Sequence, residues 1–384
     1  MPGTVTEAGP RLDARWAGGY PAQNLGSGFA LMGKKAFGAG EFRPGETAGI
    51  GVEPGRIHPL RVGARVLANN LVLAPMAGVS NLPFRLIARE AGAALTFSET
   101  VSAKGLVSGG PRTRRLLRTS VREEPVAFQL FGADPAVLGE ACRSLGGEGA
   151  AWIDLNLGCP VKKFIRNRAG SALLREPERV AMLVRAMRRG FDGVLSVKLR
   201  SGWDAGSVNA PEIARIAVAE GAQLVSVHGR TRAQQYTGQA DRAVIRQVVE
   251  AVPGVPVLAN GDVVLPGQVF EMLRETGAAG VMIGRGALGN PWIFAQALAL
   301  GRGEAGRSPA PPERHATVRR HIDLMSACFD DRRALVHNLK KYVTAYAKGL
   351  RGSAAFRQRV VETAELDVLL DLTERFFTSW REAA

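Results

Sequence analysis

A repeat of short apolar runs, each followed by a segment of helical spacing, constrains the fold of this chain more than any other feature. The repeat extends from about Arg61 to Trp292. Near-continuous apolar runs of this length are typical of strands buried on both faces, as in parallel sheets. Eight runs have this character: Leu71–Met76, Ala94–Ser98, Val126–Leu130, Trp152–Leu157, Val194–Leu199, Leu224–His228, Val255–Ala259 and Gly280–Gly284.

The segments between these runs have the apolar spacing of amphipathic helices. Pro135–Leu145, Pro177–Arg189 and Pro211–Glu220 begin with proline, which is common in the first turn of a helix, and Gly267–Thr276 has similar spacing. Eight strand–helix units in succession predict an α/β fold, the (β/α)8 TIM barrel. A doubly wound sheet is the alternative, but it would usually have five or six strands, and no GxGxxG follows the first strand here.

The two flanks of the repeat differ from it. Residues 1–56 are rich in Gly, Ala and Pro without a sustained period, which predicts a disordered N-terminal extension. After the last strand, Glu313–Lys348 and Arg359–Trp380 have helical spacing. We therefore expect a barrel domain over residues 57–305 and a small helical domain over residues 306–384.

The charge of the chain favours a polyanionic partner. It has 50 Lys and Arg against 35 Asp and Glu, a net charge of +15, which points to nucleic acid before membrane, although a GC-rich genome also raises the Arg content. One segment of the helical region contains eight cations and no acidic residue, which favours a phosphate-binding face over an ordinary basic surface. These cations are Arg332, Arg333, Lys340, Lys341, Lys348, Arg351, Arg357 and Arg359.

Cysteine usage and hydropathy exclude several classes of protein. The three cysteines are too few and too scattered for a disulfide framework, and no CxxC or Cys/His spacing suggests a metal site. No apolar run reaches the roughly 18 residues of a membrane span, and the N-terminus lacks the pattern of a secretory signal. We expect a soluble, cytoplasmic monomer without a metal.

Active sites of such barrels lie where strands meet the loops that follow them. At the last two strand ends, Asn260-Gly261-Asp262 and Gly284-Arg285 place glycines and a guanidinium where barrels commonly hold a phosphate. The glycines allow backbone N–H groups to approach the phosphate, and Arg285 can bind it through two donors. Bare βα turns are the alternative.

Three polar residues end other strands. Lys198 can stabilise negative charge at the barrel mouth, or pair with a carboxylate such as Asp154. Gln129 offers both a donor and an acceptor, which matches the imide edge of a flavin or a pyrimidine. His228 can donate to a cofactor or act as an acid, or it is a satisfied structural residue.

Cys159 follows the strand at Trp152–Leu157, in a polar turn, and comes after Asn156. A buried cysteine is usually a small apolar residue, but the setting of this one favours chemistry. Four cations follow it and suggest an anionic substrate, or a thiol whose pKa they lower. These cations are Lys162, Lys163, Arg166 and Arg168.

With these residues, the chain resembles the tRNA-dihydrouridine synthases, flavin enzymes that reduce specific uridines in transfer RNA. The resemblance covers about Ile57 to the C-terminus, and NLGCPVKKFIRNRAGSALL resembles the B-type bacterial branch. Six ordered motifs carry it: LAPMAGVSNLPFR at Leu73–Arg85, LNLGCP at Leu155–Pro160, KLRSGW at Lys198–Trp203, HGRTRAQQYTG at His228–Gly238, NGD at Asn260–Asp262 and IGRGALGNPWIF at Ile283–Phe294.

The resemblance implies a role for each matching residue. Cys159 matches the catalytic cysteine of the family, and the helical domain matches its tRNA-binding domain. The residues implied to contact the uracil are Asn156, Arg200 and Tyr236. The residues implied to bind FMN are Pro75, Met76 and Ala77 at the ring, Gln129, Lys198 and His228 at its polar edge, and Asn260, Gly261, Asp262, Gly284 and Arg285 at the phosphate.

The expected reaction has two halves, in which NADPH or NADH reduces FMN and the flavin then passes a hydride to C6 of a uridine in the D-loop of tRNA. The cofactor supplies the hydride chemistry. Cys159 is expected to protonate C5, since an ordinary thiol is mostly protonated at neutral pH. Two alternatives stay open: a flavin barrel acting on a free pyrimidine, against which the basic helical region argues, and a non-catalytic RNA-binding protein.

Overall fold

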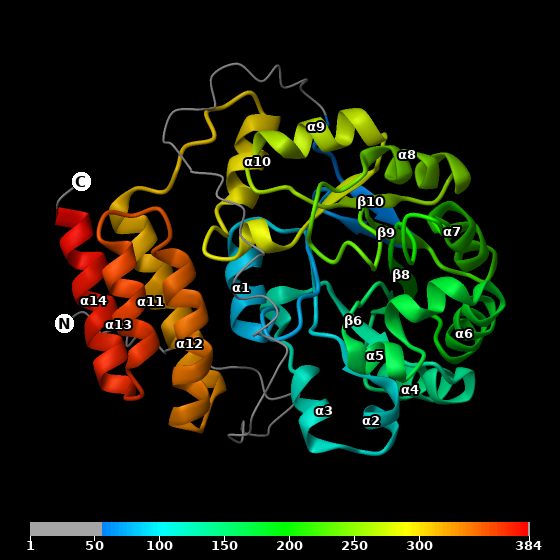
Figure 1. The fold of residues 1–384 in the computed structure, drawn as a ribbon, viewed down its shortest axis with the longest axis horizontal. Coiled ribbons are helices and arrows are strands. Elements are labelled where there is room, and N and C mark those ends of the chain that lie inside the picture. Colours follow the sequence, from blue (N-terminus) through cyan, green and yellow to red (C-terminus); the bar gives the residue numbers. More distant parts are fainter. Residues whose placement is uncertain (1–55, 383–384) are drawn as a thin grey trace, which may run out of the picture.

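The computed structural model describes residues 56–382, and the predicted N-terminal extension lies outside them except for Arg56. Eight parallel strands form a closed barrel, and helices surround it (Figure 1). The predicted TIM barrel is confirmed. Its strands are β3 (Leu71–Leu73), β4 (Leu95–Phe97), β6 (Val126–Phe131), β7 (Trp152–Leu157), β8 (Val194–Arg200), β9 (Leu224–His228), β10 (Val257–Asn260) and β11 (Gly280–Ile283).

Two pairings complete the ring of strands, and the first of them joins the two ends of the sequence repeat. Strand β11 pairs with β3, with Val281 opposite Leu71, and β4 pairs with β6, with Thr96 opposite Val126. A two-residue strand, β5 (Val101–Ser102), follows β4 and pairs further along β6. Because all eight strands are parallel, their carboxyl ends and following loops meet at one end of the barrel.

Two strands have the predicted bounds, four differ from the prediction by one residue at one or both ends, and two differ by more. Trp152–Leu157 and Leu224–His228 are as predicted. The first strand ends at Leu73, three residues early, because the chain turns after Pro75. The seventh starts at Val257, after Pro256, which has no N–H to donate to a neighbouring strand.

Capping residues fix where the outer helices begin. The side chain of Asp134 accepts from Ala136 and Val137 at the start of α4 (Pro135–Gly147), as expected of an N-cap. The other barrel-region helices are α1 (Leu82–Glu90), α2 (Ala103–Val107), α3 (Pro111–Leu116), α5 (Lys162–Arg166), α6 (Pro177–Gly190), α7 (Ala210–Ala219), α8 (Arg242–Ala251), α9 (Gly267–Thr276) and α10 (Ile293–Gly301). Short 3-10 helices are η1 (Val121–Glu123), η2 (Gly170–Arg175) and η3 (Arg285–Ala287).

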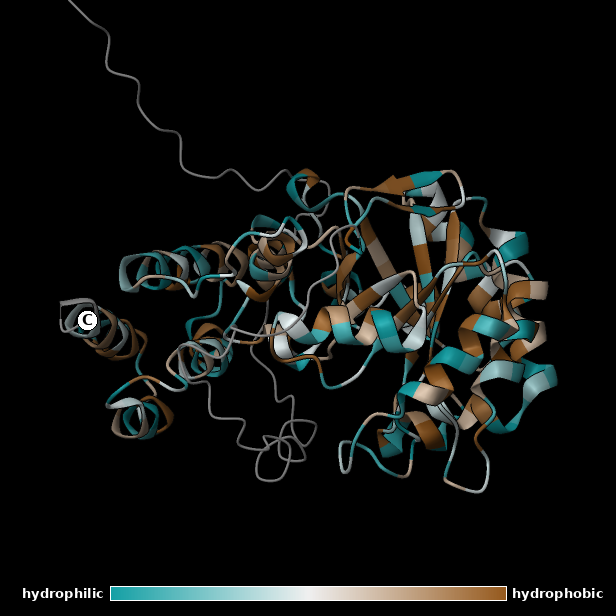
Figure 2. Ribbon diagram, turned by 90° about the horizontal axis from the view of Figure 1, so that it is seen from above, coloured by the Kyte–Doolittle hydropathy of each residue, from teal (hydrophilic) through white to brown (hydrophobic). Residues whose placement is uncertain are grey.

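The amino end of the barrel is filled with apolar side chains. An antiparallel hairpin, β1 (Leu60–Val62) and β2 (Arg65–Leu67), contributes three of them. They form one cluster with inward-facing residues of the strands, whose apolar colour is visible in Figure 2. The cluster includes Leu60, Val62, Leu67, Val72, Leu95, Phe97, Ala127, Trp152, Leu224, Leu258 and Met282. The hydrophobic effect of this burial holds the hairpin against the barrel.

The C-terminal region is helical, as predicted, but it has four helices where the spacing indicated two long segments. They are α11 (Pro311–Cys328), α12 (Arg332–Tyr346), α13 (Ser353–Glu362) and α14 (Leu366–Glu382). Asp331 caps α12 through two backbone N–H groups, which explains the break after Cys328. The region lies on one side of the barrel (Figure 1), and no helix within residues 56–382 is long and apolar enough to cross a membrane.

Candidate active site at the carboxyl end of the barrel

Strand register gathers the predicted polar residues at the carboxyl end of the barrel. Asn156 lies opposite Lys198 across β7 and β8, and Arg200 lies opposite His228 across β8 and β9. His228 in turn lies opposite Asn260 on β10. Because side chains of a strand alternate between its faces, these positions point into the barrel while the residues between them pack against helices.

A chain of amide hydrogen bonds runs from the buried Asp154 to the cysteine turn. Gln129 donates from Nε2 to Asp154 Oδ2 at 2.8 Å, and its Oε1 accepts from Asn156 Nδ2 at 2.8 Å. Asn156 Oδ1 then accepts from the backbone N–H of Cys159 at 2.9 Å. Thr100 also donates to Gln129 Oε1. These bonds fix which end of each amide faces the barrel mouth.

Cys159 is partly exposed at this mouth, and burial raises the pKa of its thiol above the ordinary range. A hydrogen bond from the Val161 N–H and the charge of Arg200 oppose that shift of the pKa. The four cations after the turn are not among its causes, and Arg168 is paired with Glu176 at 2.6 Å. The thiol is therefore protonated at neutral pH, which suits an acid.

Lys198 does not form its predicted alternative ion pair. Its ammonium donates to Asn260 Oδ1 at 3.1 Å, while the two oxygens of Asp154 accept from Ser196 and Gln129. Burial, and then the nearby charge of Arg200, lower the pKa of Lys198 to about 8, and burial raises that of Asp154 to about 6. Lys198 thus presents a positive charge to the mouth near neutral pH.

Two arginines at the barrel mouth contact the same aromatic ring. The ring of Tyr236 lies between two guanidinium groups, 5.5 Å from that of Arg200 and 4.5 Å from that of Arg285. Arg200 also donates to the backbone carbonyls of Thr231 and Gln235, which holds the loop that carries Tyr236. Arg200, Tyr236 and Arg285, named from separate motifs, therefore form one group.

The two segments predicted to bind phosphate, Asn260–Asp262 and Gly284-Arg285, are adjacent, but their residues differ in role. Gly261 has φ +135°, and a Cβ there would lie 2.4 Å from Ala240, so the close approach requires glycine. Asp262 accepts from Arg230 at 2.7 Å and lies 3.7 Å from Arg285. Its carboxylate is better suited to orienting these two arginines than to contacting a phosphate.

His228 is neutral in this setting. Burial lowers its pKa well below the ordinary value, and the charges of Arg200, Lys198, Arg230 and Arg285 lower it further. A neutral imidazole can still donate one hydrogen bond, but it supplies no positive charge.

The charge balance at the mouth suits FMN. Lys198, Arg200, Arg230 and Arg285 bring four cations together, and Asp262 is paired with two of them. Arg200 and Arg230 are buried and the other two are partly buried, and such an excess of positive charge is costly without an anion. A ribityl phosphate and the electron-rich edge of a reduced flavin are anions of the required kind.

The sequence motifs missed some residues of this site. Arg230 lies within HGRTRAQQYTG and contacts Asp262, but its role appears only when β9 and β10 are adjacent. Thr100 and Asp154 orient Gln129, but no sequence motif around them indicates this role. Within the described part of the chain, no group of three or more His, Cys, Asp or Glu could hold a metal ion.

The basic segment of the helical region is less uniform than its composition suggests. Arg332 pairs with Asp367 at 2.8 Å, which lies beyond the segment in sequence but beside it in space. Lys340 donates to the carbonyl of Val361, and Lys341 reaches the barrel at Gly78. Arg357 also donates to the carbonyl of Ser353, so at least half of the eight cations have partners within the protein. Arg333, Arg351 and Arg359 are exposed.

Comparisons with known proteins agree with this arrangement. The family model of dihydrouridine synthase (Dus) matches residues 72–380. "tRNA-dihydrouridine synthase B" of Xanthomonas axonopodis pv. citri is 38% identical over 83% of this chain and 96% of its own length. The protein of the same name from Pseudomonas aeruginosa is 36% identical with the same coverage. A "Probable tRNA-dihydrouridine synthase" of Mycobacterium tuberculosis is 37% identical over 81% of this chain and 84% of its own length.

A closed parallel barrel with a thiol and cations at its carboxyl end defines a class of barrel enzyme. Within that class, the chain belongs to the dihydrouridine synthase family. It is therefore an oxidoreductase, as the motifs predicted, and the names of the relatives agree with the predicted B-type branch.

Proposed function

We propose that this chain reduces the C5–C6 double bond of uridines in the D-loop of tRNA, with FMN and NAD(P)H, and that Cys159 is the proton donor. The observation that carries the proposal is that a thiol, kept protonated by burial, lies at the same barrel mouth as a cluster of buried and partly buried cations. Family membership and the names of the relatives support tRNA as the substrate.

The proposed FMN site uses the backbone of Pro75–Ala77 against the ring and Lys198 with Gln129 at its polar edge. The Gly261 and Gly284 turns, with Arg285, would hold the phosphate, and Asp262 would orient Arg285. When bound, FMN supplies the hydride that NAD(P)H has delivered to it. The positive charge of Lys198 would favour the reduced, anionic form of the cofactor.

Cys159 would deliver its proton to C5 of the uracil. The Asp154–Gln129–Asn156 chain supports this role, since it fixes the backbone N–H of Cys159 and so the direction of its side chain. Asn156, Arg200 and Tyr236 would position the base, which must leave its stack at a cost of about a few kcal/mol.

Phosphate contacts would offset part of this cost. Lys162, Lys163 and Arg166 are exposed on α5 directly after the cysteine turn, and the exposed cations of the helical region add a second set. This separation of two basic surfaces suits a large folded RNA better than a free pyrimidine.

The test is whether the purified protein forms dihydrouridine in tRNA from a strain that lacks this gene. Mass spectrometry of the tRNA detects the product. Purified protein should be yellow, release FMN on denaturation, and reduce uridine in that tRNA when NADPH is added. Reoxidation of the flavin by tRNA, and not by free uridine, would separate this proposal from a free-pyrimidine enzyme. A colourless protein that does not take up FMN would contradict it, as would tRNA binding without flavin reoxidation.

A further inference from the structure

Helix α12 of the helical region contacts the turn that follows the first barrel strand. Tyr342 donates from its hydroxyl to the carbonyl of Val79 at 2.6 Å, and the ammonium of Lys341 donates to the carbonyl of Gly78. Both contacts join residues that are 263 positions apart in sequence. Helix α12 is thus hydrogen-bonded to the backbone of the barrel at this turn.

The same turn is held from the barrel side. Glu99, at the end of β4, accepts from the N–H of Gly78 at 2.5 Å, so this peptide segment is bonded on both sides. Burial raises the pKa of Glu99 and lowers that of Lys341 to about 8, and the charge of each opposes the shift of the other. The Met76–Ser80 turn is closed internally by Val79 N–H and Ser80 N–H donating to Met76.

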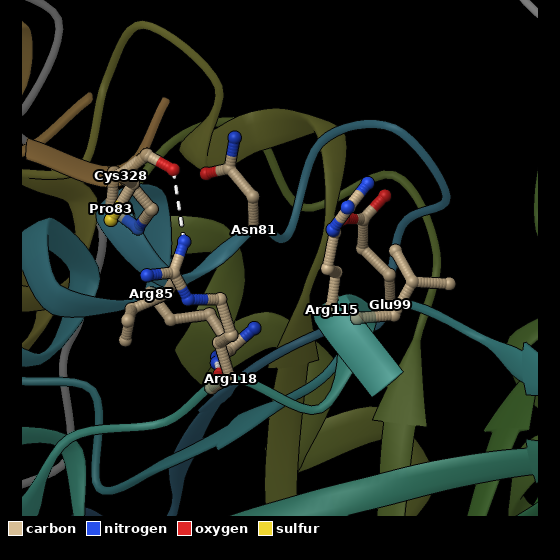
Figure 3. Close-up of a pocket in the computed structure, with 9 residues that line it drawn as sticks. Asn81, Pro83, Arg85, Glu99, Arg115, Arg118 and Cys328 are labelled. Carbon is tan, nitrogen blue, oxygen red and sulfur yellow. Dashed lines mark hydrogen bonds between the residues drawn. The ribbon is translucent and has the colours of Figure 1, made fainter. Parts of the chain in front are cut away.

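Glu99 also faces the junction between the two parts of the molecule. A hollow at this junction is lined by Glu99 and Arg85 from the barrel and by Cys328 from the end of α11 (Figure 3). Arg118 crosses the junction and donates to the carbonyl of Cys328 at 2.9 Å. The contact of α12 with the turn is therefore part of a larger contact surface between the barrel and the helical region.

A second barrel loop contacts the same helix. Gly289, in the loop after β11, has φ +76°, and a Cβ there would lie 2.4 Å from the backbone of Ala345. Trp292 packs against Tyr346 with ring centroids 5.8 Å apart. Because β3 and β11 are neighbours in the barrel, α12 spans the loops that follow both.

We propose that Lys341, Tyr342 and Glu99 are positioning residues for the cofactor, and that α12 completes the flavin site by fixing the Met76–Val79 turn. The inference rests on the proposed function, in which the backbone of Pro75–Ala77 contacts the FMN ring. A turn bonded at Gly78 and Val79 from both sides holds the preceding peptide groups in place before FMN binds. The same helix belongs to the region proposed to bind tRNA, so the RNA and flavin sites share one rigid element.

Two tyrosines on one face of α12 provide a matched test. Tyr342→Phe removes the bond to Val79, whereas Tyr346→Phe removes a bond of similar kind, to His321 Nδ1 at 3.0 Å within the helical region. We expect Tyr342→Phe to weaken FMN binding about five- to tenfold, in keeping with one lost hydrogen bond, and Tyr346→Phe to leave it unchanged. FMN affinity is measured by fluorescence quenching without tRNA, well below the melting temperature of each variant.

The lysines provide a second pair. Lys341→Met should weaken FMN binding more than Lys340→Met, although both remove one positive charge from α12. Hydrogen exchange of the apo-protein should show faster exchange of the Gly78 N–H in Lys341→Met and Tyr342→Phe than in the two controls. Glu99→Gln keeps an acceptor for Gly78, so its loss of FMN affinity should be smaller than that of Lys341→Met.

The outcomes separate the two proposals. If wild-type protein binds no FMN, the proposed function fails and the positioning role fails with it. If wild-type protein binds FMN and the Tyr342→Phe and Lys341→Met variants bind it equally well, only the positioning role is wrong. A loss of tRNA affinity in Lys341→Met with unchanged FMN affinity would assign Lys341 to RNA phosphates instead.

Discussion

The two ends of the barrel are built from the same eight strands and have opposite chemistry. At the amino end the inward side chains are apolar and covered by the β1–β2 hairpin, as with Val72, Trp152 and Leu258. Towards the carboxyl end, inward residues further along the same strands are polar, as with Asn156 and Asn260. A few residues along each strand thus separate the part that stabilises the barrel from the part that performs chemistry.

The largest effect should come from the carboxyl end. Cys159→Ala should lower dihydrouridine formation by about 10² to 10⁴, the usual contribution of a positioned acid, with little change in the melting temperature. Mass spectrometry of tRNA measures the product. Cys142→Ala, which removes a buried thiol from α4, is the matched control and should keep its activity. Full activity of Cys159→Ala would remove the thiol from the mechanism.

The opposite pattern is expected at the amino end. Leu258→Ala should destabilise the fold by about 2 to 5 kcal/mol, because the side chain is fully buried against the hairpin and leaves a cavity. Urea denaturation measures the loss in free energy of unfolding. FMN affinity at low temperature should be close to that of wild type, and a large loss of affinity would show that the two ends are not separable.

Lys198→Met tests the charge at the mouth. Removing a partly buried cation that faces an anionic cofactor should weaken FMN binding roughly 10- to 100-fold, in keeping with a charge-assisted hydrogen bond. Fluorescence titration of apo-protein measures the affinity. Lys104→Met, which removes an exposed charge on α2, is the control. Equal affinities in the two variants would contradict a cofactor role for Lys198.

The pH dependence of FMN binding is a second test of the charge on Lys198. The pKa of Lys198 lies at about 8 in the free protein, and an anionic ligand would raise it. Protonation is then linked to binding, so affinity should fall as pH rises above about 8, by at most about tenfold per unit. Titrations from pH 7 to pH 9.5 should show this slope in wild type and a smaller one in Lys198→Met. Identical slopes would assign the dependence to another group.

The smallest effects concern the exposed cations on α5. Replacing Lys162 by Met should weaken tRNA binding a fewfold and reduce the slope of log affinity against log salt by about 0.7 to 0.9, the value for one phosphate contact. Filter binding across a salt series measures it. FMN affinity should not change, and an unchanged salt slope would place α5 outside the RNA-binding surface.

Much of this architecture was predictable because its signals are local. Apolar runs such as Trp152–Leu157 and Leu224–His228 predicted their strands to the residue, and proline at position 135 predicted the start of a helix. The motif residues Cys159, Lys198 and Arg285 were predicted at strand ends, and all three lie near Arg200 at the barrel mouth. Their assigned roles with FMN and tRNA remain predictions.

The partners of these side chains were not predictable, because they come from distant parts of the chain. The sequence left open whether the cations after Cys159 lower the pKa of its thiol, and in the structure burial raises that pKa instead. Lys341 was counted in a basic segment, but it contacts Gly78 and the region of Glu99. Arg332 was counted as uncompensated and pairs with Asp367.

The sequence by itself determined the eight-strand α/β barrel, the helical character of the C-terminal region and the family, because periodicity and motifs are properties of neighbouring residues. Only the tertiary structure decided which charges are neutralised and which end of each amide faces the barrel mouth. It also decided that α12 is hydrogen-bonded to the turn after the first strand. Electrostatic and hydrogen-bond energies depend on distance and burial in space, and residues such as Gly78 and Lys341 acquire both only when the chain has folded.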